Sequence, residues 1–218
     1  MGGEQDRIEF EDLDALAAEL ERQAEIYKGL VGKDEIMKLL APRPEGLPSW
    51  LNIPVVTLGK SVDLKIQADF INIDMSPRVL DGVARFGGII YDSPHLIWMS
   101  DGRKYAYKSG YYKGGYREPN LYRHNVLDVL NDAERLATHY DGVALAIVCP
   151  RFTKILQDHE LPNVVTFGSV ISGTCEDTQW GERCSVPYFF YYGQDSQIKL
   201  YEEGESSGFN GGALTCSG

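Results

Sequence analysis

The pattern of apolar and polar residues near the N-terminus predicts an amphipathic helix. Over residues 13–31, apolar side chains recur at steps of three and four, and the positions between them are mostly charged or amide residues. Such a stripe needs a surface to pack on, because an isolated helix of this length is only marginally stable in water. Gly32 ends the helix, a short second helix follows Asp34, and three prolines within residues 42–48 favour an extended connection. Residues 1–48 are therefore expected to form a helical arm with a proline-rich linker.

Two other segments carry strand-like patterns. Residues 62–70 alternate between apolar and polar with a period of two, which predicts a strand, and the phase changes at Phe70-Ile71, which suggests a bulge. Residues 143–148 are apolar throughout, as expected of a central strand that is covered on both faces. The 3.6-residue spacing of apolar positions over 125–140 predicts a helix that lies across this sheet.

The remaining patterns predict short elements and complete the fold class. The class expected is α+β: a mixed, mostly antiparallel sheet with one covering helix and the N-terminal amphipathic arm. The chain then divides into the arm and linker (1–48), a core domain (49–201) and a Gly/Ser-rich acidic tail (202–218) that should be mobile. The short elements are a helix from Ser76-Pro77, an antiparallel meander over 89–107 with a turn at Asp101-Gly102, a helix over 151–159 leading to a strand over 164–171 that completes a βαβ unit, and a hairpin over 186–201.

Composition narrows the classes of partner. The 218 residues carry a formal net charge of -11, which disfavours non-specific binding to nucleic acid or to anionic lipid. No apolar run approaches the roughly 18 residues that a membrane-spanning helix needs, and the N-terminus does not resemble a secretory signal. We therefore expect a soluble protein of the cytoplasm or of an assembled particle, without a membrane partner and with nucleic acid an unlikely one.

The four cysteines do not form a recognisable metal or disulfide framework. Cys149 closes an apolar run and is expected to be buried, whereas Cys175 and Cys184 are placed so that a bridge between them would close a loop of about ten residues. Because the sequence shows no signal peptide, we expect reduced thiols, and a disulfide between Cys175 and Cys184 is the alternative. No paired short spacing of the zinc type occurs, and we expect no cofactor.

Motifs for catalysis are also missing from the sequence. The four histidines form no metal-binding pair, and His139 and His159 are expected to cap helix ends. Neither a phosphate-binding glycine loop nor a nucleophile elbow is present. An enzyme of transferase or hydrolase type would need a site assembled from residues far apart in the sequence, for which the candidates are His95, Arg117, His124 and Glu182.

One segment has the composition of an interface. Residues 101–125 hold six basic residues against two acidic ones, interleaved with six tyrosines and with Gly110, Gly114 and Gly115, whereas residues 1–40 hold eleven acidic residues against five basic ones. Opposite charges on the arm and on this segment suit head-to-tail contact between copies, although the arm could equally fold onto its own chain. A plain surface and the stacking of nucleic acid or sugar are the alternatives for the segment. The predicted interface residues are Leu13, Leu16, Leu20, Tyr27, Arg103, Lys108, Tyr111, Tyr112, Lys113 and Arg117.

The function that these patterns favour is that of a non-enzymatic structural or assembly component of a multi-subunit particle, for example of virion or phage type. Its partners would be other copies of itself or other protein subunits. The two alternatives are the enzyme described above and a regulatory module that binds an acidic partner through the basic Tyr-rich segment.

Overall fold

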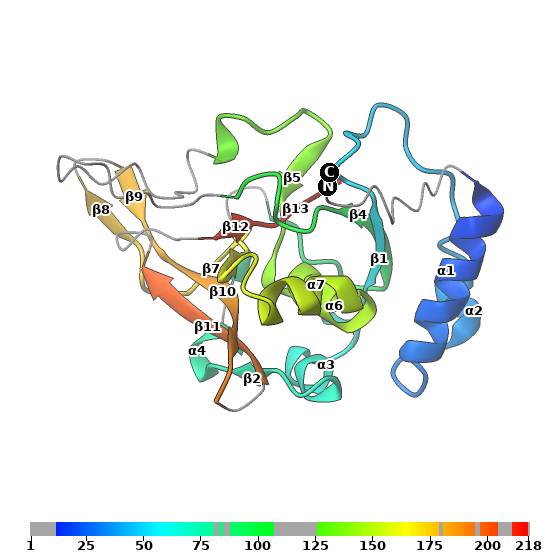
Figure 1. Ribbon diagram of the computed structural model, residues 1–218, viewed down its shortest axis with the longest axis horizontal. Coiled ribbons are helices and arrows are strands. Elements are labelled where there is room, and N and C mark those ends of the chain that lie inside the picture. The colour runs from blue at the N-terminus through cyan, green and yellow to red at the C-terminus, as the bar shows by residue number, and fades with distance from the viewer. Residues whose placement is uncertain are drawn as a thin grey trace.

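The computed structural model describes residues 12–80, 83–84, 88–106, 126–178, 181–194, 197–204 and 211–217. In these residues helices and mixed sheets combine, which confirms the predicted α+β class (Figure 1). The helices are α1 (Leu13–Ile26), α2 (Lys33–Met37), α3 (Leu64–Phe70), α4 (Pro77–Leu80), α6 (His139–Val148) and α7 (Pro150–Gln157), together with a 3-10 turn, η1 (Gly59–Ser61).

The strands form a four-stranded sheet with the order β1-β4-β13-β5 and a five-stranded sheet with the order β12-β6-β10-β11-β2. The first sheet is antiparallel throughout, and the second contains the parallel pairs β11-β2 and β12-β6. The strands are β1 (Ile53–Thr57), β2 (Asp74–Met75), β3 (Val83–Ala84), β4 (His95–Met99), β5 (Glu134–Leu136), β6 (Asn163–Val165), β7 (Ser169–Val170), β8 (Glu176–Thr178), β9 (Gly181–Arg183), β10 (Ser185–Tyr192), β11 (Gln197–Gly204), β12 (Gly212–Ala213) and β13 (Thr215–Ser217).

The predicted hairpin is confirmed, but the predicted meander and βαβ unit are wrong. Strands β10 and β11 pair antiparallel, with Tyr188 opposite Tyr201. Among the described residues of the expected meander, β4 is the strand, and its neighbours are β1 and β13, so Asp101-Gly102 does not close a hairpin. The helix expected over 151–159 forms as α7, yet β6 after it pairs antiparallel with β10. Short apolar runs do not reveal which distant strand they will pair with.

The segment 143–148, which was expected to be a central strand, is a helix. A helix and not a strand therefore lies in the middle of the main core. The side chain of Thr138 caps α6 and Asp141 completes a capping box, so the chain turns into a helix directly before the apolar run. Every residue of the run is buried, and a helix that is buried all round has no polar face to distinguish it from a covered strand. The helix expected over 125–140 is likewise wrong, because Glu134–Leu136 forms strand β5.

Within the segment 62–70, where the alternation predicted a strand, residues 64–70 form helix α3. Asp63 caps the helix by accepting a hydrogen bond from the backbone N–H of Lys65, 2.8 Å away. Leu64 and Ala68, four residues apart, face the core, whereas two other apolar residues of the alternating set, Ile66 and Phe70, are exposed. The phase change that suggested a bulge is the end of this helix. The helix predicted from Ser76-Pro77 is α4, although it extends only to Leu80.

The C-terminal segment, expected to be a mobile tail, supplies strands to both sheets. Strand β12 pairs with β6, and β13 lies between β4 and β5, so that Cys216 is opposite Met99 on one side and Arg135 on the other. Residues 211–217 are all buried. Small residues fit this place because neighbouring backbones approach closely: a Cβ at Gly212 would lie 2.3 Å from the carbonyl oxygen of Gly102.

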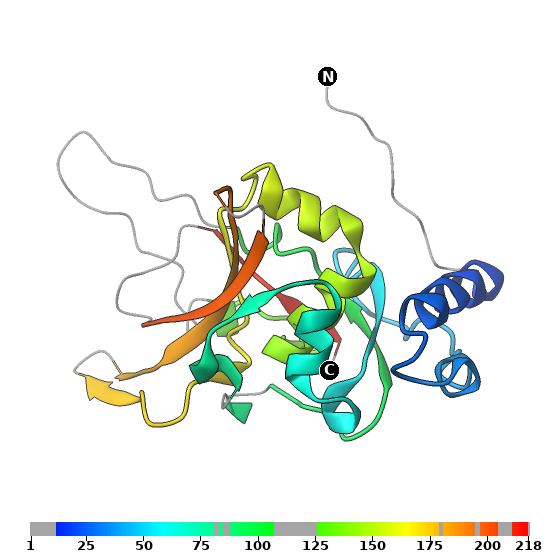
Figure 2. The same cartoon turned by 90° about the horizontal axis from the view of Figure 1, so that it is seen from below.

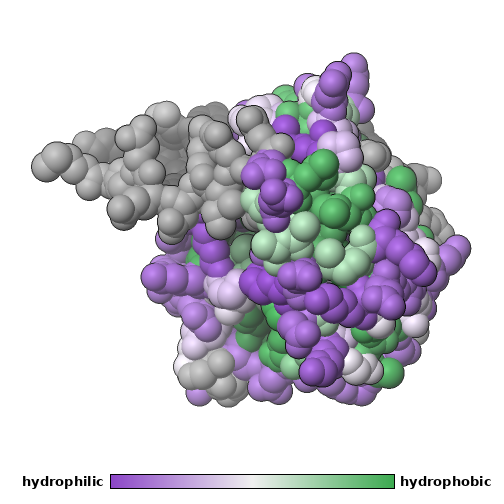
Figure 3. Space-filling model, turned by 90° about the vertical axis from the view of Figure 1, so that its right-hand side faces the viewer, coloured by the Kyte–Doolittle hydropathy of each residue, from purple (hydrophilic) through white to green (hydrophobic). Residues whose placement is uncertain are grey.

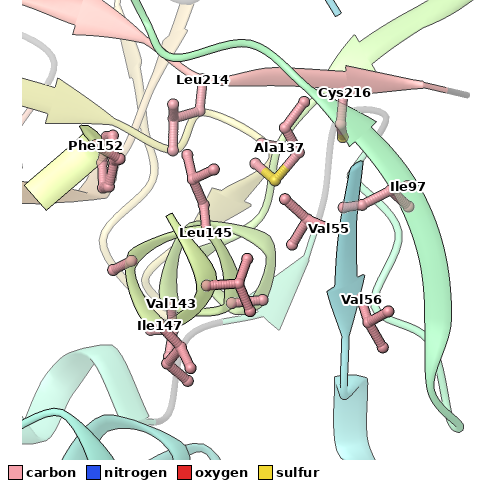
Figure 4. Close-up of a cluster of buried hydrophobic side chains, with 14 of the residues drawn as sticks. Val55, Val56, Ile97, Ala137, Val143, Leu145, Ile147, Phe152, Leu214 and Cys216 are labelled. Atoms are coloured by element: carbon pink, nitrogen blue, oxygen red, sulfur yellow. The ribbon is translucent and has the colours of Figure 1, made fainter. Parts of the chain in front are cut away.

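The main core surrounds helix α6. Val143, Leu145 and Ile147 of α6 pack among side chains of β1, β4, β13 and α7 (Figure 4). Gly142 lies against the ring of Phe189 on β10, and a Cβ there would be 2.5 Å from that ring. Helix and strand can therefore meet closely because residue 142 has no side chain.

The cysteines divide into a bridged pair and two thiols. Cys175 and Cys184 form a disulfide across the ends of the β8-β9 hairpin, which is the alternative that the sequence left open. Cys149 is partly buried between α6 and α7, and Cys216 is buried in β13. In the described part of the chain, no helix has the length and apolar character needed to cross a membrane.

Candidate functional site

The N-terminal arm packs on its own chain. Asp12 caps α1 by accepting a hydrogen bond from the N–H of Asp14, and α1 and α2 lie together at one end of the molecule beside β1 (Figures 1 and 2). Of the arm residues predicted to contact other subunits, Leu16, Leu20 and Tyr27 are buried in this chain's core, and Leu13 is 46% exposed. The stripe is thus satisfied intramolecularly, the alternative that the sequence allowed.

Side chains of α1 close the outer edge of the four-stranded sheet. Among the described strands, β1 is at the edge of its sheet, and one side of its backbone has no strand partner there. The side-chain amide of Gln23 donates to the carbonyl oxygen of Pro54 over 2.7 Å and accepts from the N–H of Val56 over 2.8 Å. The hydroxyl of Tyr27 donates to the carbonyl oxygen of Val56 over 2.8 Å, and burial raises the pKa of this phenol well above its usual range. Helix residues therefore make the hydrogen bonds that a neighbouring strand would make.

A charged residue of the same helix makes a further contact with the body of the protein. Arg22 forms a two-point contact with Glu19 and donates to the carbonyl oxygen of Val148, at the end of α6, over 2.5 Å. Figure 3 looks onto this end of the molecule, where hydrophilic side chains border a smaller apolar area.

The connection between the arm and β1 is fixed in its second half. The guanidinium of Arg43 donates to the carbonyl oxygens of Leu47, Pro48 and Leu51 and lies 5.5 Å from the centre of the Trp98 ring. Before Arg43, in contrast, Leu40, Ala41 and Pro42 are exposed. If the arm changed direction, the backbone would therefore bend within residues 38–42.

A hollow of about 260 Å³ lies between this connection and β4. The ring of His95 stacks on that of Tyr91, with the ring centres 4.0 Å apart and the planes inclined by 12°. Burial lowers the pKa of His95, and the positive charge of Arg135 behind Tyr91 lowers it further, so the neutral imidazole is favoured. A neutral imidazole can donate one hydrogen bond and accept another. The hollow is lined by Leu39, Ala41, Pro42, Pro44, Tyr91, His95, Leu96, Trp98 and Ser217.

A buried ion pair lies next to Tyr91, one of the residues that line this hollow. Arg135 of β5 and Asp141 of α6 are 3.0 Å apart, and both side chains are almost completely removed from solvent. Asp141 also accepts hydrogen bonds from the backbone N–H and the hydroxyl of Thr138. The thiol of Cys216 lies 4.0 Å from the same carboxylate. Burial raises the pKa of this thiol well above its usual range. This thiol therefore stays protonated and is a poor nucleophile.

His139 and Ser169 form a second buried pair. The Nδ1 atom of His139 is 2.7 Å from the Ser169 hydroxyl oxygen, and neither residue is exposed to solvent. Burial lowers the pKa of His139 to about 4. Within the described residues its Nε2 atom has no hydrogen-bond partner. His139 is the first residue of α6, whose cap is Thr138, so the expectation that His139 caps the end of a helix is wrong. Because His139 and Ser169 are both fully buried, this pair is closed to substrate.

The Glu134 carboxylate gathers hydrogen bonds from three distant segments. It accepts from the indole N–H of Trp50 over 2.9 Å, from the hydroxyl of Tyr105 over 2.8 Å and from the hydroxyl of Thr215 over 2.5 Å. Lys104 lies 4.1 Å from the centre of the Trp50 ring. The cluster joins β5, β13, the arm connection and the start of the basic Tyr-rich segment.

The other predicted interface and catalytic residues are mostly outside the described part of the chain. Arg103 is described: it forms an ion pair of 2.6 Å with Glu160 at the surface. Glu182 is in β9, at the opposite end of the molecule from the arm (Figure 1), and the structure does not bring it near His95. The residues that lie outside the described ranges are Lys108, Tyr111, Tyr112, Lys113, Arg117 and His124.

Sequence reasoning missed the polar residues that organise these sites. Gln23 lies on the buried side of α1 between Leu20 and Ala24, and a glutamine on the apolar stripe was a signal that a buried polar contact exists. Thr138-x-x-Asp141 had the spacing of a capping box, which was a signal for the start of α6. Arg135 gave no local signal, because its partners come from other elements.

Among the described residues, no group of three or more His, Cys, Asp and Glu side chains could hold a metal ion. No family model matches the chain, and neither a curated protein nor a solved structure does. Function is therefore inferred from the arrangement of the residues themselves.

Proposed function

We propose that this protein is a non-enzymatic assembly component whose copies are joined by exchange of the N-terminal arm, residues 12–42. The observation that carries the proposal is the closure of the β1 edge by Gln23 and Tyr27 of α1. Exchange of an identical element between copies reuses the intramolecular contacts, so an arm from a neighbour would find the same stripe and the same hydrogen bonds.

The construction of the arm supports exchange. Its two helices contact each other and meet the rest of the chain mainly through one stripe, of which Leu16, Leu20 and Tyr27 are the large members. The connection is exposed at residues 40–42 and is clamped to the body only from Arg43 onward. A small change of direction in these residues would redirect both helices as a unit.

The position of β1 at the edge of its sheet favours arm exchange. An uncovered edge strand pairs readily with other chains, and proteins therefore cover it. When the arm leaves its own edge, the edge remains covered only if another arm replaces it, which favours a closed or extended series of exchanged copies over free arms. The basic Tyr-rich segment would add a second contact, an expectation that rests on composition alone.

Shortening of the connection tests the proposal. If copies are joined by arm exchange, light scattering of the parent should detect a dimer or larger species. Deletion of Leu40, Ala41 and Pro42 shortens the connection and should hinder return of the arm to its own β1 edge, so we expect the proportion of these species to rise. A control variant replaces the same three residues by glycine and serine without altering the length, and it should keep the parent's mass distribution. A shortened chain that remains a folded monomer would refute arm exchange.

A further inference from the structure

The β10-β11 hairpin carries aromatic side chains on the face that points away from the main core. Residues alternate between the two faces of a strand, and cross-strand partners share a face. On the inner face, Phe189 and Leu200 are fully buried, and Phe189 packs edge-on against Phe152 of α7 with ring centres 5.9 Å apart. The outer face holds Tyr188, Phe190 and Tyr192 of β10 and Tyr201 of β11. We call these four residues the aromatic face.

Three rings of the aromatic face contact one another, and Tyr192 adjoins them through Lys199. Tyr188 and Phe190 stack with ring centres 5.3 Å apart and planes inclined by 19°, and Tyr201 meets Phe190 edge-on at 5.8 Å. At one end Tyr188 packs against a smaller group of buried side chains that includes Val165, Phe167 and Val186, and at the other end Tyr192 is 38% exposed. A half-exposed phenylalanine between two tyrosines has no hydrogen-bonding reason to face solvent, so the surface is suited to contact with a ligand.

Two opposite charges lie within the aromatic face and neutralise each other. The ammonium group of Lys199 is 3.4 Å from the Asp74 carboxylate and 4.5 Å from the centre of the Tyr192 ring. The Tyr201 hydroxyl donates to the same carboxylate over 3.0 Å. The face therefore combines ring surfaces with hydrogen-bonding groups and carries no net charge of its own.

From this arrangement we infer that the aromatic face is a binding surface for an uncharged saccharide. A pyranose ring presents C–H groups on its faces and hydroxyl groups around its rim, so its face packs on an aromatic ring while the rim hydroxyls reach polar side chains. Phe190 and Tyr192 supply the rings, and Asp74 supplies an acceptor beside them. Neither partner needs a net charge for this contact.

Two other ligand classes fit the surface less well. Single-stranded nucleic acid also stacks on aromatic side chains, but its phosphates require cationic partners, and Lys199 is paired with Asp74 in a chain of net charge -11. A wholly apolar partner would bury the pair of Lys199 and Asp74 without offering it hydrogen bonds, which is unfavourable. A neutral ligand that carries hydroxyl groups satisfies both conditions.

Titration of the full-length protein with defined probes tests the inference. We expect at least one of cellohexaose, laminarihexaose, mannohexaose and chitohexaose to bind in a calorimetric titration, and a single-stranded oligothymidylate not to bind. The tyrosine and phenylalanine ring resonances of the aromatic face should shift in NMR spectra on binding. Absence of binding by all four hexasaccharides would overturn the inference, and so would oligothymidylate binding at this face.

Matched variants locate the contact. Tyr192→Ala changes the most exposed ring of the face and should weaken saccharide binding by about tenfold or more, as expected for loss of an aromatic anchor. Phe70→Ala removes a comparably exposed ring, 43% exposed, on helix α3, and should leave binding unchanged. Because Tyr192 is exposed near the end of its strand, unaltered thermal unfolding of the variant will show that it folds. Equal binding by the parent and a folded Tyr192→Ala variant would place the saccharide elsewhere.

Discussion

The side-chain oxygen of Gln23 accepts a hydrogen bond from the backbone N–H of Val56 over 2.8 Å, so that a helix residue occupies the position of a neighbouring strand. The nitrogen of the same amide donates to the other free group of this edge, the carbonyl oxygen of Pro54. The two ends of one side chain therefore satisfy a donor and an acceptor of β1 that have no strand beside them.

Replacement of Gln23 by leucine should lower the free energy of unfolding by about 2 kcal/mol or more, because the edge then has a buried donor and a buried acceptor without partners. Chemical denaturation monitored by tryptophan fluorescence measures the change. Glu25→Ala, at an exposed position of the same helix, is the control and should change stability by less than about 0.5 kcal/mol. Equal effects of the two substitutions would show that the amide contributes little.

Removal of one partner of the buried ion pair should be far more harmful than removal of one partner of an exposed pair. Asp141→Ala leaves the Arg135 charge buried and unpaired and also removes a cap of α6, so we expect a loss of about 3 to 5 kcal/mol. Asp69→Ala breaks the exposed pair with Lys65 and should cost less than about 1 kcal/mol. Thermal unfolding of both variants measures the difference, and similar values for the two would contradict this account of burial.

Stability should decrease as the pH falls from about 6.5 to about 4. The folded state holds the pKa of His139 at about 4, below the usual value of an unfolded histidine, so in this interval the unfolded chain binds a proton that the folded chain excludes. The contribution is complete above about pH 6.5 and amounts to about 3 kcal/mol for the full interval. His139→Asn should flatten this part of the stability profile, whereas His159→Asn, at an exposed position, should not. Parallel profiles for parent and His139→Asn would exclude His139 as the cause.

The C-terminal residues should be essential for folding. Truncation after residue 210 removes β12 and the central strand β13 and exposes both neighbours of β13, β4 and β5. We expect the truncated protein to lose its cooperative thermal transition. Ser217→Ala keeps the strand and removes only a hydroxyl that accepts from the N–H of Trp98, so it should unfold cooperatively with a smaller loss. A cooperative transition in the truncated protein would mean that β4 and β5 hold together without β13.

Reduction of the disulfide should have a moderate effect. The bridge between Cys175 and Cys184 closes a loop of about ten residues, for which the chain-entropy model gives about 2 to 3 kcal/mol. Cys175→Ser with Cys184→Ser should lower the denaturation midpoint accordingly, and reducing agent should then have no further effect. Cys149→Ser is the control, because Cys149 is a free thiol in the folded chain. A parent whose midpoint is insensitive to reductant would contradict the bridge.

Local sequence patterns were informative for elements whose structure depends mainly on their own residues. The stripe of α1 needs only one covering surface, and the apolar runs of β10 and β11 are separated by turn-forming residues, so both elements could be predicted from the sequence directly. The capping signals at Asp12 and Asp63 are equally local, although the alternation at 62–70 obscured the second one. The apolar and polar patterns together also indicated the α+β class, and the lengths of the apolar runs disfavoured a membrane-spanning helix.

The sequence by itself thus determined that an amphipathic arm exists, that a hairpin forms over 186–201 and that the class is α+β. Only the tertiary structure decided that 143–148 is a helix, because a segment covered on all sides has no polar face to display its period. It also decided that 215–217 is a central strand, since β13 gains its stability from β4 and β5, neither of which is near it in the sequence. The contacts of Gln23 with β1 and of Arg135 with Tyr91 depend in the same way on segments far apart in the sequence, which no local pattern specifies.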